Sequence, residues 1–217
     1  MYVPETIGCL AFLKENLTEL QQSVIAGFQV TCVGNNGPFS YLPSREENNL
    51  SDRLIKAVAI GLNLDLKVYP FQQRGSDERQ YCHPRVNLPV ASLMRSKYGN
   101  YKEYHTSGDN LNFISPEGLS GSFAFYWNMV NVLENNFTLS AKTIGEPNLG
   151  KRGLYSKISN SKFSNDQEIR FNILGYADGK NDLISLIHKL AKTPTDIIKQ
   201  VNILLSHELI EMDKNLK

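Results

Sequence analysis

Two short segments of the chain combine residue types that can bind a ligand or a metal. The first, Gly75–Tyr81, places serine, aspartate, glutamate and arginine in a row between two stretches that alternate like strands. Adjacent acids beside a glycine and a cation can position a ligand, and α/β proteins carry such groups on loops at strand ends. The alternative, an ordinary solvated loop, is what composition alone favours.

The second segment is Tyr104–Asn110, which contains His105 close to a serine and an aspartate. Histidine with a carboxylate nearby can ligate a metal ion or transfer protons. An isolated histidine is more often a solvated surface residue, and that alternative stays open. The other histidines of the chain have no such neighbours.

Glu5 is a further candidate, and the turn Gly34–Gly37 resembles a phosphate loop only in its glycines. Glu5 precedes an expected helix, where its carboxylate either interacts with the positive end of the helix dipole or acts as a catalytic group at a strand end. The glycine-rich turn is not a phosphate loop, because no Lys-Ser or Lys-Thr pair follows it.

The elements that carry these residues alternate between strand and helix patterns over about the first 135 residues, which predicts an α/β domain. Strands are expected at 28–33, 64–69 and 88–94, and helices after Pro4, after Ser51 and after Ser115. The first helix is expected to bury Ile7, Leu10, Ala11, Leu13 and Leu17. The last is expected to run through Phe123, Tyr126, Trp127, Val130 and Leu133.

The composition changes after this region, which predicts three parts: an α/β domain at 1–137, a linker at 138–160 and a second domain at 161–217. The linker is rich in glycine and proline around Gly145–Gly153. The last part shows three short amphipathic helices and a closing strand near Leu209, a pattern typical of a winged helix.

Charge and cysteine content narrow the function classes. The chain has 217 residues, 23 basic and 22 acidic, with a formal charge of +1. This balance excludes global electrostatic attraction to nucleic acid or to an anionic membrane. No stretch is long and apolar enough to span a membrane, and the start lacks a signal-peptide pattern. Three scattered cysteines favour reduced thiols, so a cytoplasmic protein is expected.

Taken together, the motifs resemble one family. Four motifs occur in the order found in dinuclear zinc aminopeptidases: Glu5-Thr6-Ile7-Gly8, Thr31-Cys32-Val33-Gly34, Ser76-Asp77 and Tyr104-His105. The segment Gly145–Tyr155, Gly-Glu-Pro-Asn-Leu-Gly-Lys-Arg-Gly-Leu-Tyr, is similar to one in the aminopeptidase-like family of bacterial polysaccharide-biosynthesis clusters. The resemblance covers nearly the whole chain and implies a partial zinc-aminopeptidase-like αβα sandwich followed by a winged helix.

The resemblance implies a role for particular residues. His105 matches the last zinc ligand, and Tyr104 is then placed to stabilise the oxyanion. Glu5 matches the region of a general base or a ligand. Asp77 and Arg79 fall in the loop that lines the substrate pocket. In such enzymes the metal activates a water molecule that attacks an amide carbonyl.

Two departures from the family pattern count against a complete zinc site. Thr31 and Cys32 stand where related peptidases carry an aspartate ligand. In the family, the first histidine ligand and the bridging aspartate lie upstream of the helix that precedes the position of Glu5. We therefore expect a C-terminal portion of a hydrolase linked to surface-polysaccharide synthesis. The complete site would hold a pair of zinc ions, and this chain alone would bind zinc weakly or not at all.

The expected partners follow from the same features. A chain that begins mid-domain would expose a sheet edge at Phe28–Val33, so it should self-associate or bind the missing N-terminal half or another protein. The alternative is a non-catalytic interaction protein that docks a partner through its winged helix. A DNA-binding regulator is disfavoured, because the expected third helix, Thr195–His207, carries one lysine and no arginine.

Overall fold

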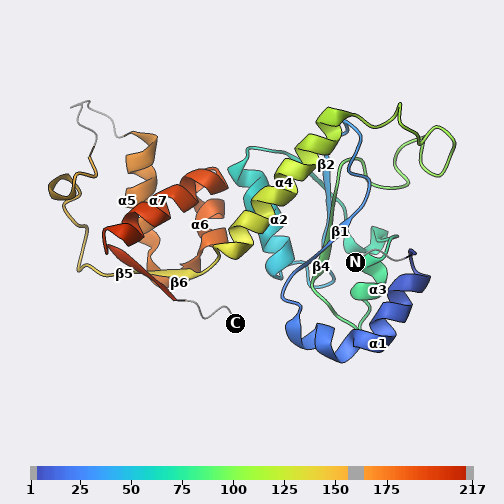
Figure 1. Cartoon of the computed structure of the whole chain (residues 1–217), viewed down its shortest axis with the longest axis horizontal. Coiled ribbons are helices and arrows are strands. Elements are labelled where there is room, and N and C mark those ends of the chain that lie inside the picture. Colours follow the sequence, from blue (N-terminus) through green and yellow to red (C-terminus); the bar gives the residue numbers. More distant parts are fainter. Residues whose placement is uncertain (1–3, 156–163, 214–217) are drawn as a thin grey trace. The chain divides into compact units, whose positions relative to one another are not determined.

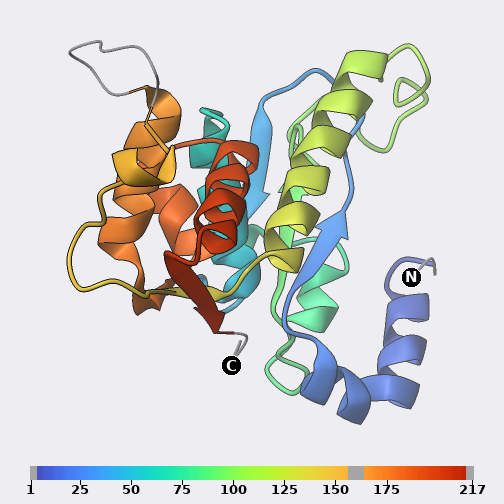
Figure 2. The same ribbon diagram turned by 60° about the vertical axis from the view of Figure 1, so that its left-hand side comes forward.

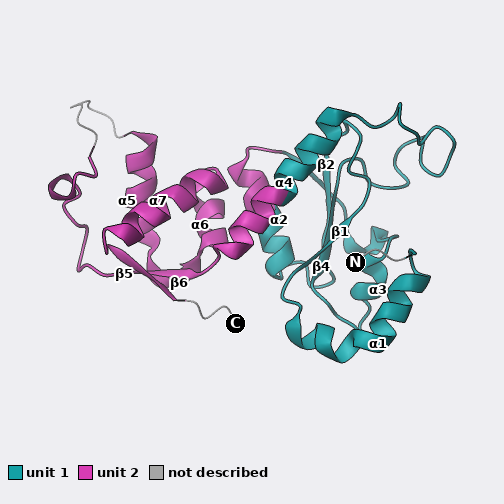
Figure 3. Ribbon diagram, viewed as in Figure 1, with its two compact units in different colours: residues 1–55, 65–126 teal, residues 56–64, 127–217 magenta. Residues whose placement is uncertain are grey.

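The computed structural model describes residues 4–155 and 164–213 and divides the chain into two compact units. Unit 1 comprises residues 1–55 and 65–126, and unit 2 comprises residues 56–64 and 127–217 (Figure 3). The strand end expected at the very start of the chain lies outside the described residues. So do the end of the expected linker, 156–160, and the first and last few residues of the expected winged helix.

Unit 1 is built on a four-stranded mixed sheet in the order β1-β4-β2-β3. Its strands are β1 (Gly27–Val30), β2 (Phe39–Leu42), β3 (Leu66–Val68) and β4 (Val90–Met94). The β1 strand runs parallel to β4, and β2 runs parallel to β3 and antiparallel to β4. Within the described residues β1 pairs on one side only, so it forms an edge of the sheet.

Helices lie on both faces of this sheet (Figure 1). They are α1 (Ile7–Ser23), α2 (Leu50–Gly61), the short α3 (Glu78–Tyr81) and α4 (Pro116–Glu134), with a 3-10 turn, η1, at Phe71–Gln73. Cys9 and Leu13 of α1 pack with Cys82 and Val90 in one apolar cluster. Phe125 of α4 packs against Phe39 of β2, with ring centroids 5.1 Å apart. The α/β domain predicted from the sequence is therefore confirmed.

The expected inward face of α1 is wrong in part. In α1, Ile7 is 71% and Leu10 48% exposed, while Cys9 and Leu13 are buried. In α4, Phe123, Trp127 and Val130 are exposed, and the buried positions include Phe125, Met129 and Val132. The first two turns of α1 and much of α4 carry apolar residues on more than one face, so spacing alone does not identify the face that packs on the sheet.

Unit 2 contains a three-stranded antiparallel sheet in the order β6-β5-β7 and three helices packed on it (Figure 2). The strands are β5 (Thr138–Ala141), β6 (Asp178–Asp182) and β7 (Ile210–Asp213), and the helices are α5 (Asn165–Tyr176), α6 (Leu183–Leu190) and α7 (Pro194–Ser206). A 3-10 turn, η2, covers Gly150–Arg152. The residues 138–141, expected in the linker, thus form a strand at the centre of this sheet.

Side-chain caps fix the starts of the last two helices. The Asp182 side chain accepts a hydrogen bond of 2.9 Å from the Ser185 N–H, and the Thr193 hydroxyl accepts one of 3.1 Å from the Asp196 N–H. Pro194 follows in the first turn of α7, where its missing N–H costs nothing. Across the described ranges, no helix has the length and apolar character needed to cross a membrane.

Candidate functional site

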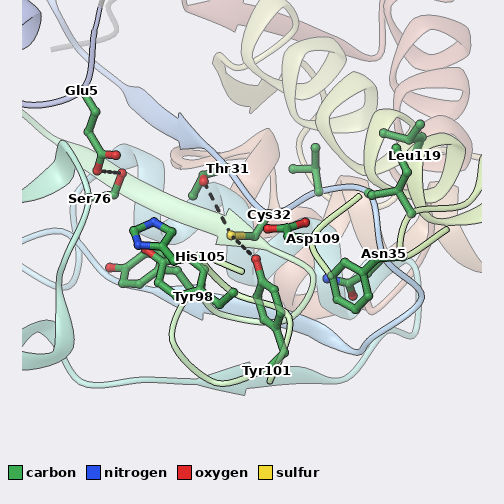
Figure 4. A pocket seen from close by; sticks show the side chains of 15 residues that line it. Glu5, Thr31, Cys32, Asn35, Ser76, Tyr98, Tyr101, His105, Asp109 and Leu119 are labelled. Carbon is green, nitrogen blue, oxygen red and sulfur yellow. Dashed lines mark hydrogen bonds between the residues drawn. The ribbon is translucent and has the colours of Figure 1, made fainter. Parts of the chain in front are cut away.

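A cavity of about 420 Å³ opens in unit 1 at the end of the sheet where β1 finishes. Four separate parts of the sequence line it: the segment before α1, the loop after β1, the loop before α3 and the long loop from β4 to α4 (Figure 4). The lining residues are Glu5, Thr31, Cys32, Val33, Gly34, Asn35, Ser76, Tyr98, Tyr101, Tyr104, His105, Asp109, Phe113, Ile114 and Leu119.

Glu5 is held in the cavity wall by the loop before α3. The Ser76 hydroxyl donates a 2.9 Å hydrogen bond to Glu5 Oε1 and accepts one of 3.3 Å from the Gln29 side chain. That loop is itself fixed by Glu78, whose fully buried Oε1 accepts from the N–H groups of Gly75 and Ser76 at 2.7 and 3.0 Å. The Tyr98 hydroxyl donates to the same oxygen at 2.7 Å. A buried carboxylate thus orders the segment that holds Glu5.

Three residues at or beside this cavity adopt backbone conformations that side chains rarely take. Thr6, Cys32 and His105 have φ values of +64°, +50° and +58°. Each such position costs about 1 kcal/mol or more and persists only where the surrounding structure enforces it. The contacts of the cavity wall therefore fix the backbone at these three residues.

Aromatic rings form one wall of the cavity. Tyr101 stacks on Phe113 with ring centroids 5.1 Å apart, and Tyr104 meets the Tyr101 ring edge-on at 5.6 Å. The His105 ring stacks on Tyr104 at 4.0 Å. The Tyr101 hydroxyl also lies 3.4 Å from the Cys32 sulfur, which joins the wall to the loop after β1.

The loop after β1 is fastened by the first turns of α4. Ser115 donates its N–H to the Gly34 carbonyl at 2.9 Å, and the Ser122 hydroxyl donates to the Val33 carbonyl at 2.7 Å. Gly118 allows this close approach, because a Cβ atom there would lie 2.2 Å from the Gly34 carbonyl oxygen. The position of Asn35 in the cavity therefore depends on α4.

The cavity is anionic. Its lining residues include the carboxylates of Glu5 and Asp109 and no lysine or arginine. Burial raises the pKa of Tyr104, and the nearby Cys32 and Glu5 raise it further. Burial also raises the pKa of Tyr101, with added contributions from its hydrogen bond to Cys32 and from Asp109. Negative charge next to these hydroxyls disfavours their ionisation.

The structure brings together three of the five residues selected from the sequence. Glu5, Tyr104 and His105 line the same cavity, although they come from opposite ends of unit 1. Asp77 and Arg79 are not among the lining residues. Asp77 Oδ1 accepts from the Thr6 N–H at 2.7 Å, and Arg79 donates to the Thr6 hydroxyl at 3.0 Å. Both therefore hold the residue that follows Glu5, and a direct contact with substrate remains a prediction.

Sequence reasoning did not select Asn35, Tyr101 or Phe113, which also line the cavity. Asn35 follows a strand within a turn-forming run, and the end of a strand in an α/β sheet is where side chains reach a site. That signal was present in the sequence. The two aromatic residues lie in a long loop without periodicity, and only the tertiary structure places them.

The residues present do not fit a zinc ion on their own. Over the residues that the structure describes, no three His, Cys, Asp or Glu side chains are grouped so that they could hold a metal. Stable zinc sites use roughly three or four protein ligands. His105 and Glu5 share the cavity, but two candidate ligands are too few to support a catalytic step through a metal ion.

Comparison with known proteins agrees with the fold. The sequence is 38% identical over 191 residues to a Clostridium acetobutylicum protein provisionally named a polysaccharide biosynthesis protein with an aminopeptidase-like domain. The match covers 87% of this chain and 44% of that protein. This chain thus spans less than half the length of the curated relative.

One solved structure shows the same fold. A crystal structure provisionally named a peptidase from Clostridium acetobutylicum superposes with a TM-score of 0.85 at 33% identity, covering 97% of this chain and 47% of the other. A more distant likeness, with a TM-score of 0.49 at 21% identity over 57% of this chain and 29% of the other, is to an aminopeptidase from Aneurinibacillus sp. strain AM-1.

Fold and site together define a peptidase-like α/β domain followed by a winged helix. Residues 1–136 match the family model described as a domain of unknown function, DUF4910, and residues 137–212 match a winged helix-turn-helix model. The chain therefore belongs to the DUF4910 family. The family resemblance and fold class expected from the sequence are confirmed.

Proposed function

We propose that this chain is a portion of an aminopeptidase-like hydrolase that cleaves an amide bond during surface-polysaccharide synthesis, with the cavity at Glu5 and His105 as its substrate pocket. The observation that supports this most is the meeting of Glu5, Tyr104 and His105 in one cavity. Glu5 lies about 100 residues before Tyr104 and His105 in the sequence. The association with polysaccharide synthesis rests on the name of the Clostridium relative.

The chain's own residues would bind and orient the substrate. Glu5 offers a carboxylate oxygen, Oε2, that makes no hydrogen bond to any described residue, while Ser76 holds the other. Tyr104 offers a hydroxyl whose raised pKa keeps it protonated, so it can donate a hydrogen bond to a substrate oxygen. His105 stacks on that ring and presents an imidazole to the cavity.

The zinc chemistry of the family would need ligands beyond those of the described residues. We propose that the complete site holds a pair of zinc ions only when residues from another polypeptide segment join His105 and Glu5, and that this chain alone does not hydrolyse amides. The open edge of β1 would then be the place where that segment, or a second copy of the chain, adds to the sheet. A cytoplasmic location is part of the same proposal.

Complementation tests the proposed function. The chain would be assayed with a panel of aminoacyl 4-nitroanilides, alone and co-purified with the part of the Clostridium relative that it does not span. We expect hydrolysis by the co-purified pair and none by the chain without its partner. His105→Ala should abolish the hydrolysis, whereas His188→Ala, at an exposed histidine on α6, should leave it unchanged. Hydrolysis by the chain alone, or by the pair despite His105→Ala, would contradict the proposal.

A second candidate is a non-catalytic protein that docks a partner through the winged helix. The observation in its favour is the neutral outer face of α7, where Lys199 is paired with Asp166 at 3.2 Å. A face with its charge neutralised suits a protein better than a nucleic acid. Mass-spectrometric identification of a stoichiometric partner that is lost on deletion of residues 161–217 would support this candidate.

A further inference from the structure

One side chain that faces the cavity carries a donor group without a protein partner. Asn35 is 5% exposed, and its Oδ1 accepts hydrogen bonds from the Gly37 N–H at 2.7 Å and the Ser96 hydroxyl at 3.1 Å. Because the Gly37 N–H can only donate, the atom beside it must be the amide oxygen. The Asn35 Nδ2 group has no acceptor among the described residues, in a side chain that lines the cavity. An oxygen on a ligand in the cavity can therefore accept from this donor.

Two carboxylates in the same cavity lack a counter-ion. Glu5 has one oxygen bound to Ser76, and the Asp109 carboxylate makes no hydrogen bond or ion pair with any residue that the structure describes. No lysine or arginine lines the cavity. Figure 4 shows Glu5 at one side of the cavity and Asp109 near Asn35 at the other side. A matching ligand carries a positive charge at one side and an acceptor oxygen at the other.

The shape and the aromatic wall narrow the ligand further. The cavity of about 420 Å³ exceeds the volume of a single six-membered sugar ring. Tyr101, Tyr104 and Phe113 present an apolar wall, and the hydroxyls of Thr31 and Ser76 add further polar contacts around it. Such a wall covers the C–H face of a sugar ring, while the surrounding polar groups bind its hydroxyls.

We propose that this cavity binds an amino sugar with a free, protonated amine. The ammonium group would lie against Glu5, ring hydroxyls would donate to Asp109 and accept from Asn35 Nδ2 at the other side, and the ring would pack on the tyrosine wall. This proposal goes beyond the proposed function, because an amino sugar with a free amine has no amide bond to cleave; it names a ligand of the same cavity and not the substrate of the hydrolysis. It requires no bond cleavage, so binding and hydrolysis can fail independently.

An NMR titration of the full chain with D-glucosamine tests the proposal. At mildly acidic pH, where the amine is protonated, we expect the Asn35 side-chain amide resonance to shift and saturate. N-acetyl-D-glucosamine and D-glucose, which lack the charge, should bind about tenfold more weakly or less. Leucinamide, an amine with a peptide-like carbonyl and no sugar ring, should also bind more weakly than glucosamine.

Matched variants distinguish binding in the cavity from nonspecific electrostatic attraction to the chain. Glu5→Gln and Asp109→Asn, both at exposed positions, should each weaken glucosamine binding about five- to tenfold. Asp65→Asn, an exposed carboxylate before β3 that does not line the cavity, should leave it unchanged. Four results would overturn the proposal: no saturable shift, equal affinity for the acetylated sugar, leucinamide binding as tightly as glucosamine, or an unaltered affinity in both cavity variants.

Discussion

Ser76 and Glu5 are joined by a 2.9 Å hydrogen bond from the serine hydroxyl to the carboxylate across 71 residues of sequence. This bond ties the segment before α1 to the loop before α3. Its geometry depends on Glu78, which binds the backbone of Gly75 and Ser76 and is fully buried. Glu78, which does not line the cavity, therefore fixes the loop that positions Glu5 in the candidate site.

Replacing Glu78 should destabilise the domain. In Glu78→Gln, one terminal position becomes an NH2 group and cannot accept from all of the donors that now meet the carboxylate: two N–H groups and the hydroxyls of Tyr98 and Ser92. A buried donor left without an acceptor costs about 1–3 kcal/mol. Urea unfolding should show this loss of stability, with Glu15→Gln on the exposed side of α1 as the control. Equal midpoints for the two variants would rule out the supporting role.

The stability of the chain should depend on the protonation of Asp77. Burial raises the pKa of this carboxyl and the charges of Glu5 and Glu78 raise it further, although the Thr6 N–H acts in the opposite direction. A raised pKa in the folded state means that the folded chain holds the proton more tightly. Protonation of Asp77 therefore stabilises the folded chain. This stabilisation is complete at a pH below 3.8, the ordinary pKa of an aspartate, and is lost as the pH rises through the pKa of the folded state.

Asp77→Asn tests this sign, because asparagine keeps the acceptor for Thr6 and removes the charge. The variant should be more stable than the parent at pH 7, and the difference should shrink as the pH falls toward 3.8. Thermal or urea unfolding across that range measures it. A variant that is less stable at pH 7, or a difference that grows on acidification, would contradict the prediction.

Two helical glycines should respond oppositely to alanine. At Gly118 the added Cβ would meet the Gly34 carbonyl oxygen at 2.2 Å, so Gly118→Ala should displace the cavity loop and cost about 1–3 kcal/mol. At Gly175 of α5 nothing lies within 4 Å, so Gly175→Ala should stabilise by about 0.5–1 kcal/mol. Calorimetry of both variants provides the comparison. A stabilising Gly118→Ala would show that α4 does not clamp the loop.

The winged helix should not bind duplex DNA specifically. The exposed positions of α7 include Thr195, Lys199 and Asn202, and Lys199 is neutralised by Asp166. A groove shared with Asn131 and Asn135 of α4 occupies part of the same face. DNA affinity depends mainly on phosphate contacts from unpaired cations. Fluorescence anisotropy with random and genomic duplexes at physiological salt should show no sequence preference, and a tight, sequence-dependent complex would refute this.

Local patterns predicted the elements of this chain better than the faces they bury. The buried strand β4 and the caps of α6 and α7 follow from runs of apolar residues and from single side chains such as Thr193. The packed faces of α1 and α4 depend on the partner surface, and Phe123 and Trp127 show that apolar spacing alone is ambiguous. For the site, motif order selected Glu5, Tyr104 and His105. Asn35 emerged only when its hydrogen bonds could be counted in three dimensions.

The most direct test of the proposed function is the zinc content of the purified chain, measured by mass spectrometry of the metal after dialysis against a chelator. The chain offers His105 and Glu5 in one cavity, and no group of three candidate ligands exists among its described residues. A zinc site needs roughly three or four ligands. We predict substoichiometric zinc that the chelator removes. A pair of stoichiometric, chelator-resistant zinc ions per chain would contradict the proposed function.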